Sequence, residues 1–175
     1  DVFASSNEIS FMLNGLTGRK VLNSRRAHSG MYVDVDRRWA DAAVLFYGNN
    51  SKVIEEIIKK YKIKYVYWQA NWVSLDFRFD DEGNLVDIFD PFLIKYTKEY
   101  EKYLEENGVK FIKTKYWLDP ANRAEDVKKF DVLLVIPYNL SDFDPFSPEF
   151  KKYLRVVKEF KEDEEVIARV YEIVT

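Results

Sequence analysis

The apolar positions of this chain follow two repeats, and each repeat predicts one kind of element. A spacing of three and four residues, which places side chains on one face of a helix, occurs in four segments. These segments cover residues 7–17, 34 or 36 to 47, 51–62 and 91–107. The predicted N-caps are Ser6, Ser51 and Asp90, and the predicted ends are Gly18, Gly48 and Gly108. In the first helix, the side chains expected to face the core are Ile9, Met12, Leu13 and Leu16.

Alternating or continuous runs of β-branched and aromatic residues predict the strands. They cover residues 1–4, 20–23, 63–68, 109–117 and 131–137, with hairpins over 74–89 and 154–174. The run over 131–137 is continuously apolar, which is typical of a strand in the middle of a sheet. Because strands alternate with helices, we predict an α/β fold: a layered α/β/α domain with a mixed, partly parallel sheet and a C-terminal antiparallel hairpin.

Composition bounds the class of protein. The 175 residues predict a single domain over 1–175, and 47% hydrophobic with 17% aromatic residues excludes a disordered chain. The absence of cysteine excludes disulfides, thiolate zinc sites and a cysteine nucleophile. No run reaches the roughly 20 apolar residues that span a bilayer. Since the chain starts without Met and directly in a predicted strand, we expect a soluble piece of a longer protein.

The charged residues argue against a nucleic-acid partner and draw attention to residues 16–38. With 27 basic and 30 acidic residues, the net charge of -3 removes the overall attraction on which sequence-independent nucleic-acid binding depends, so no nucleic-acid partner is expected. Residues 16–38 nevertheless hold six Lys and Arg. Arg19, Lys20, Arg25 and Arg26 suit a phosphate or a sugar-lipid head group, and they equally suit ion pairs with Glu8, Asp34, Asp36 and Asp41. Pairing is the favoured interpretation.

The same segment contains an Asp-x-Asp pair and the histidine of the chain. Asp34 and Asp36 resemble the carboxylate pair with which many glycosyltransferases hold a divalent cation, since hard cations prefer clustered carboxylate oxygens. Two Asp residues before a helix are more often caps, which is the favoured interpretation. His28 has no partner histidine and no nucleophile motif beside it, so a catalytic triad is unsupported and it remains a candidate binding residue.

Two further features bear on ligands. Trp68, with Tyr67 and Trp72, offers apolar ring faces on which sugars or bases stack, although aromatic residues at strand ends are commonly core. Asn49 and Asn139 each begin an Asn-x-Ser sequon in a predicted loop. Such acceptors favour an exposed, extracytoplasmic surface.

The order of these pieces resembles a known family. The phrases "SSNEISFMLNGLTGRKVLNSRRAH", "RRWADAAVLFYGNN", "VIEEIIKKYKIKYVYW" and "VIARVYEIV" resemble the C-terminal region of archaeal multi-spanning membrane glycosyltransferases. These are relatives in architecture of the oligosaccharyltransferase catalytic subunit and of dolichyl-phosphate-sugar-dependent transferases. The resemblance is strongest over residues 4–68 and 166–174. It implies an extracytoplasmic domain whose partners are the membrane-embedded part of the same chain and a glycan or acceptor peptide.

The resemblance also implies that this piece is not catalytic. In the family, the metal and catalytic carboxylates lie in loops of the membrane-embedded part, so a divalent metal belongs to the parent protein and no cofactor to this domain. Where the oligosaccharyltransferase carries Trp-Trp-Asp-Tyr-Gly, this chain has "SSNEIS", which leaves Asn7 and Glu8 as polar candidates. The rival hypothesis is a stand-alone α/β enzyme or ligand-binding protein, with its site at the carboxyl ends of parallel strands. That site would be lined by Asn7, Arg19, Trp68 and Tyr138.

Overall fold

The computed structural model describes residues 1–26, 29–69, 76–89, 92–117, 129–139 and 143–174. The helices are α1 (Asn7–Thr17), α2 (Val35–Tyr47), α3 (Ser51–Tyr61), α4 (Lys98–Glu106) and α5 (Pro148–Lys151). The strands are β1 (Val2–Ala4), β2 (Lys20–Val21), β3 (Ile63–Gln69), β4 (Asp76–Phe79), β5 (Leu85–Phe89), β6 (Leu93–Lys95), β7 (Lys110–Trp117), β8 (Lys129–Ile136), β9 (Leu154–Glu162) and β10 (Glu165–Ile173). None of the described helices is long and apolar enough to cross a membrane.

The strands form two five-stranded sheets. Sheet A has the order β2-β1-β3-β10-β9, and sheet B has the order β4-β5-β7-β8-β6. β1 pairs parallel with β2 and β3, β5 pairs parallel with β7, and the remaining pairs are antiparallel. The predicted α/β class, the mixed and partly parallel pairing, the C-terminal hairpin and the mid-sheet position of β8 are therefore confirmed.

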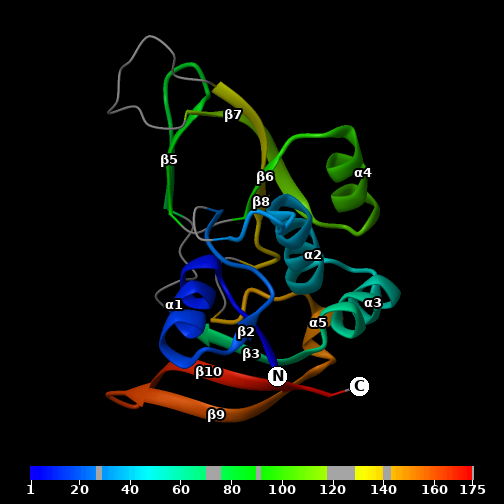
Figure 1. Cartoon of the computed structure of the whole chain (residues 1–175). Coiled ribbons are helices and arrows are strands. Elements are labelled where there is room, and N and C mark those ends of the chain that lie inside the picture. The colour runs from blue at the N-terminus through cyan, green and yellow to red at the C-terminus, as the bar shows by residue number, and fades with distance from the viewer. Residues whose placement is uncertain (27–28, 70–75, 90–91, 118–128, 140–142, 175) are drawn as a thin grey trace.

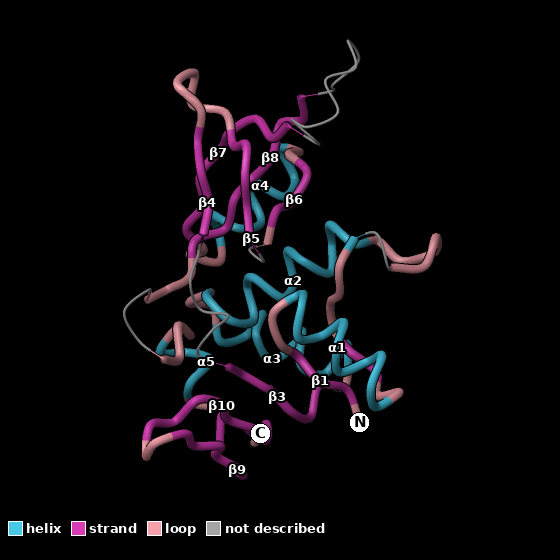
Figure 2. Tube along the Cα trace, turned by 90° about the vertical axis from the view of Figure 1, so that its left-hand side faces the viewer, coloured by secondary structure: helices cyan, strands magenta, loops and turns pink. Residues whose placement is uncertain are grey.

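The layering differs from the single sheet that we expected. Figures 1 and 2 show sheet A at one end of the molecule, sheet B at the other, and α1, α2, α3 and α5 between them. The cause is α2, in which every residue from Trp39 to Tyr47 is buried. A helix buried on all sides needs apolar cover on all sides, and the two sheets supply it together with the neighbouring helices.

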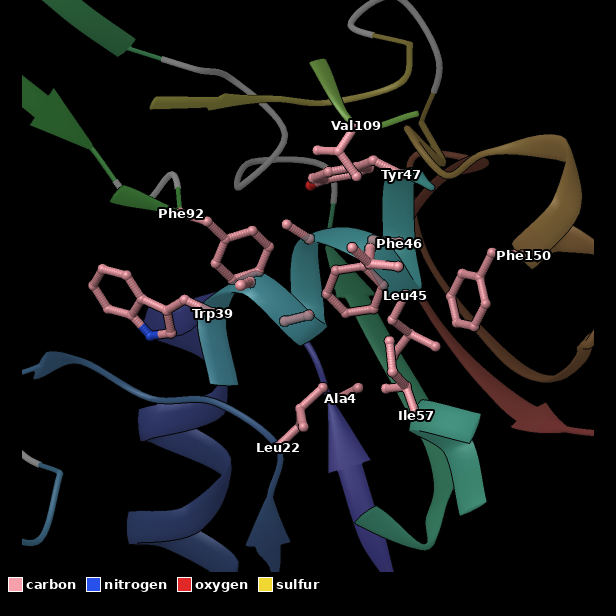
Figure 3. Close-up of a cluster of buried hydrophobic side chains, with 14 of the residues drawn as sticks. Ala4, Leu22, Trp39, Leu45, Phe46, Tyr47, Ile57, Phe92, Val109 and Phe150 are labelled. Atoms are coloured by element: carbon pink, nitrogen blue, oxygen red, sulfur yellow. The ribbon is translucent and has the colours of Figure 1, made fainter. Parts of the chain in front are cut away.

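The core runs through the molecule by way of α2. Figure 3 shows its side chains Leu45, Phe46 and Tyr47, with Ala4 on one side and Val109 on the other. Phe46 lies at the centre of an aromatic group, with ring centroids 5.4–6.1 Å from the rings of Trp68, Phe92, Phe146 and Phe150. Aromatic rings at such spacings stabilise a core beyond the area that they bury.

Two predicted helices need correction. The helix expected from Asp90 begins at Lys98, because Thr97 caps it by accepting a hydrogen bond from the Tyr100 amide at 3.1 Å. Leu93–Lys95 instead pairs with β8, while Asp90 and Pro91 lie outside the described residues. α3 is capped by Asn50 in place of Ser51.

The apolar face predicted for α1 is also wrong. Ile9 is buried, but Met12 and Leu16 are exposed to solvent. The buried side of α1 is made with Ile9, Asn7 and Ser10, of which Asn7 accepts a hydrogen bond from Asn23, so small polar residues took the place expected for Met12 and Leu16. The predicted cap Ser6 and the predicted end at Gly18, whose φ is 66°, are confirmed.

Candidate ligand-binding cleft

A cavity of about 440 Å³ lies beside β2 and is lined mostly by residues 20–39, which is the polar run that the sequence singles out. We call it the basic cleft. Its lining residues are Val2, Asn14, Lys20, Val21, Leu22, Asn23, Ser24, Ser29, Val33, Val35, Arg38, Trp39, Lys60 and Tyr61. The volume falls in the range of small-molecule sites in proteins.

Local sequence explains how β2 comes to form one wall. Gly18 adopts a left-handed conformation that ends α1, and Asn14 Nδ2 donates a hydrogen bond to the Arg19 carbonyl at 2.9 Å. The chain then enters β2, where Lys20 lies opposite Val2 in parallel register. The Leu22 amide donates to the Phe3 carbonyl at 2.9 Å, which holds this short strand against β1.

Three lining residues are basic, and none of the described lining residues is acidic. Lys60 is paired, with Nζ 2.8 Å from Asp41 Oδ2. Arg38 donates to the Leu22 carbonyl at 3.2 Å and its guanidinium lies 5.7 Å from the Tyr61 ring centroid. Within the described parts of the chain, neither Lys20 nor Arg38 has a carboxylate partner. Two cations whose charge is not neutralised by any described residue favour an anionic ligand.

Asn23 adds a buried polar group to the same wall. Its Nδ2 donates to the Ser5 carbonyl at 2.9 Å and to Asn7 Oδ1 at 2.8 Å. Its own Oδ1 is buried and has no partner among the described residues. Asn7, a predicted binding residue, is itself buried and is held by Asn23, so it borders the cleft only through that side chain.

Of the other predicted basic residues, Arg25 and Arg26 form ion pairs, as favoured from the sequence, whereas Arg19 has no carboxylate partner among the described residues. Arg25 pairs with Glu8. Arg26 makes a two-pronged contact with Asp36, at 2.6 and 2.9 Å. Burial raises the pKa of Asp36, but the hydrogen bonds from Arg26 and from the Lys95 amide outweigh it and hold that pKa below its usual value. These side chains are therefore already committed within the domain.

Asp34 and Asp36 bind different partners within the domain. Asp34 caps α2 by accepting from the Arg37 amide at 2.9 Å, and it lies 3.4 Å from the Tyr100 hydroxyl. Burial and the charge of Asp34 raise the pKa of Tyr100 to about 12. Asp36 binds Arg26 and the Lys95 amide. Among the described residues, no group of three or more metal-ligating side chains gathers, at this pair or elsewhere.

The remaining candidates do not meet at one site. The prediction that Trp68 offers a ring face to a ligand needs correction. Its side chain is 3% exposed, and its ring lies 4.9 Å from that of Phe146 in the core. Arg19 precedes β2 at the amino ends of the parallel strands, whereas Asn7 follows the carboxyl end of β1. Tyr138 is exposed beyond β8, in sheet B. The site of the rival hypothesis is therefore not assembled.

The remaining predicted positions lie on the surface or outside the described residues. Asn49 is exposed between α2 and α3. Asn139 is half-buried, and the rest of its sequon lies outside the described residues, as do His28 and Trp72. A sequon position exposed like Asn49 meets the first requirement for glycosylation.

Sequence reasoning missed Arg38 and Lys60 as members of a site. Lys60 belongs to the charged end of α3, where Lys residues are common because they complement the helix dipole. Nothing in the local pattern connects it with Lys20, which the fold brings to the same cleft.

No family model matches the chain, and no curated protein matches it. Among solved structures, the chain is similar to the C-terminal globular domain of an oligosaccharyltransferase from Archaeoglobus fulgidus. The two are 12% identical, the match covers 99% of this chain and 84% of the other, and the TM-score is 0.42. That domain is of the class that the sequence resemblance names. A likeness of this extent says only what the chain is similar to.

Proposed function

We propose that this chain is a non-catalytic, extracytoplasmic domain of a glycosyltransferase-like membrane protein, and that its basic cleft binds an anionic glycan. The observation that carries the proposal is the presence of Lys20 and Arg38 in one cleft without a carboxylate partner among the described residues. The resemblance of the sequence to archaeal membrane glycosyltransferases gives the proposal its setting.

The lining chemistry suits a sugar that carries a phosphate or a carboxylate. The Arg38 guanidinium offers paired donors to such an oxyanion, and the Lys20 ammonium adds a second charge. Ser24 and Ser29 supply groups for sugar hydroxyls. The half-buried Tyr61 ring also lines the cleft, with Lys60 Nζ 4.7 Å and the Arg38 guanidinium 5.7 Å from its centroid.

The same lining supports a binding role over a catalytic one. Acid-base chemistry at a glycosidic bond needs carboxyl groups flanking that bond. The described lining residues include none, and the nearby carboxylates Glu8 and Asp36 are bound to arginines. We assign the reaction, and any divalent metal that it needs, to other parts of the parent protein.

A titration tests the proposal directly. Binding of a uronate-containing oligosaccharide by the 175-residue chain is measured by calorimetry, beside a neutral oligosaccharide of equal length. We expect Arg38→Gln and Lys20→Gln each to weaken binding of the acidic glycan by about tenfold or more, since hydrogen bonds to charged groups contribute roughly 1.5–3 kcal/mol. Lys161→Gln, on the exposed hairpin, is the matched control. Equal binding of both glycans, or equal loss in all three variants, would show the proposal to be wrong.

The cleft by itself also fits a stand-alone ligand-binding protein, and the parent gene separates the two hypotheses. Several apolar spans of about 20 residues encoded in the same gene support the membrane protein. An encoded product without such spans supports the stand-alone protein, whose anionic ligand the same titration would find.

A further inference from the structure

Four large apolar side chains stand in solvent on the part of the chain that precedes α2. Met12 and Leu16 on α1 are 46% and 82% exposed, and Met31 and Tyr32, in the segment leading to α2, are 92% and 98% exposed. Single exposed apolar residues are ordinary on protein surfaces. Four from so short a stretch of sequence are a feature that needs an explanation.

The two segments that carry these residues lie on the same side of the molecule in Figure 2. Met12 and Leu16 are four residues apart, which places them on one face of α1, away from the buried Asn7 and Ser10. Figure 2 shows α1 and the loop that leads into α2 along the same edge of the molecule, at the right of the view.

Charge is distributed unevenly in the same region. From Ile9 to Val33 the sequence contains no Asp or Glu, although the whole chain has a net charge of -3. Arg25 and Arg26 are paired with Glu8 and Asp36, which lie just outside this stretch. Arg19 and Lys20 are exposed, and neither has a carboxylate partner among the described residues. The edge is therefore both apolar and positively charged.

We propose that this face, made by residues 11–20 and 29–33, rests on the anionic surface of a lipid bilayer. Met12, Leu16, Met31 and Tyr32 would enter the interfacial layer, where apolar side chains leave water and a tyrosine ring is well accommodated. Arg19 and Lys20 would lie at the level of the lipid phosphates. The face shares Lys20 with the cleft, whereas Met31 and Tyr32 do not line the cleft, so variants at these two positions separate this inference from the glycan-binding proposal.

A second copy of the chain is a poorer occupant of this face. A two-fold contact places the same patch on both sides of the interface, so Arg19 and Lys20 of one copy would face the same cations of the other. An anionic lipid surface instead complements these charges while it accepts the apolar side chains.

Vesicle sedimentation tests the proposal with the 175-residue chain. One set of vesicles contains phosphatidylcholine with about a third phosphatidylglycerol, and the other contains phosphatidylcholine alone. At about 1 kcal/mol for each basic residue at an anionic surface, the two cations predict binding about 30-fold tighter to the anionic vesicles, and this preference should fall as salt is raised.

Matched double variants assign the binding to this face. Met31→Ser with Tyr32→Ser should weaken binding to the anionic vesicles about tenfold, because two apolar side chains no longer enter the interface. Val156→Ser with Val157→Ser removes two exposed apolar side chains from β9, 46% and 48% exposed, and should bind as the parent chain does. Circular dichroism establishes that both variants are folded.

Three outcomes would overturn the proposal. The first is no binding of the parent chain to anionic vesicles, and the second is equal loss in the two double variants. The third is a dimer in gel filtration that only the Met31 and Tyr32 variant abolishes, without vesicle binding, which would make the face a contact between copies. Under the proposal, both double variants bind the acidic glycan as the parent chain does. Failure of the membrane-binding proposal is therefore distinguishable from failure of the glycan-binding proposal.

Discussion

Asp41 is a carboxylate with no exposed surface, and it is held by side chains from three helices. Arg37 Nε lies 3.0 Å from it and Lys60 Nζ 2.8 Å, while the hydroxyls of Tyr61 and Tyr103 donate to it at 2.7 and 2.9 Å. A buried charge is tolerated when its hydrogen-bonding capacity is filled in this way. The group joins α2 to α3 and α4.

Removing that charge should destabilise the chain. Asp41→Asn leaves Arg37 and Lys60 without their carboxylate partner. We expect the free energy of unfolding to fall by about 2–3 kcal/mol, less than for a fully buried ion pair, because both cations are partly exposed. Urea titration measures it. The control is Glu106→Gln, whose pair with Lys102 is exposed and should change stability by less than about 0.5 kcal/mol. Equal effects of the two substitutions would contradict the role of Asp41.

The same group predicts a loss of stability at alkaline pH. Burial, and then Asp41, raise the pKa of Tyr61 and Tyr103, and Asp41 raises the pKa of Lys60 against the effect of burial. Groups whose pKa is higher in the folded chain stabilise it fully below their unfolded values, which are 10.0 for Tyr and 10.5 for Lys, and less as pH rises further. The urea midpoint should fall above about pH 10, and less steeply in Tyr103→Phe. A flat midpoint would contradict this.

At the scale of elements, caps and turns account for both the confirmed and the failed predictions. The caps at Ser6 and Asp34 are where the sequence placed them. Asp90-Pro91 satisfies the same local rule as Thr97, yet the helix begins after Thr97. The reason is that Leu93–Lys95 gains backbone hydrogen bonds to β8, a partner some 40 residues away that no local rule includes.

The β9–β10 turn offers a test at this scale. Asp163 and Glu164 both have positive φ, 45° and 70°, a conformation in which side chains are disfavoured. Glu164→Gly should therefore stabilise the chain by about 1 kcal/mol and raise the melting temperature by about 2–4 °C. Glu162→Gly, in the adjoining strand, should lower it, because glycine weakens strands. A lower melting temperature for Glu164→Gly would show that the turn is not strained.

At the scale of the molecule, the core predicts how the chain unfolds. One hydrophobic cluster takes in residues of both sheets through α2. We therefore expect far-ultraviolet circular dichroism and tryptophan fluorescence to report the same single thermal transition, as the predicted single domain requires. Because no metal-ligating group gathers among the described residues, the transition should be unchanged by a chelator. Separate melting of sheet B, or a lower midpoint with chelator, would contradict these expectations.

The sequence by itself determined the features that depend on near neighbours. These include α1, α2, α3, the cap at Asp34, the two hairpins and the apolar strand β8, because helical and strand periods, caps and tight turns are complete within a few residues. The favoured ion pairs of Arg25 and Arg26 belong here as well, since their partners lie within 17 residues.

Only the tertiary structure decided which side of α1 is buried, how the strands divide into two sheets, and which cations share a cleft. Met12 and Leu16 have the spacing of a core face, but the packing of Asn7 against Asn23 turns that face to solvent. Lys20 lies in β2, before α2, and Lys60 lies near the end of α3, yet both line one cavity. Contacts of this kind join residues far apart in the chain, and periodicity, which compares only near neighbours, carries no information about them.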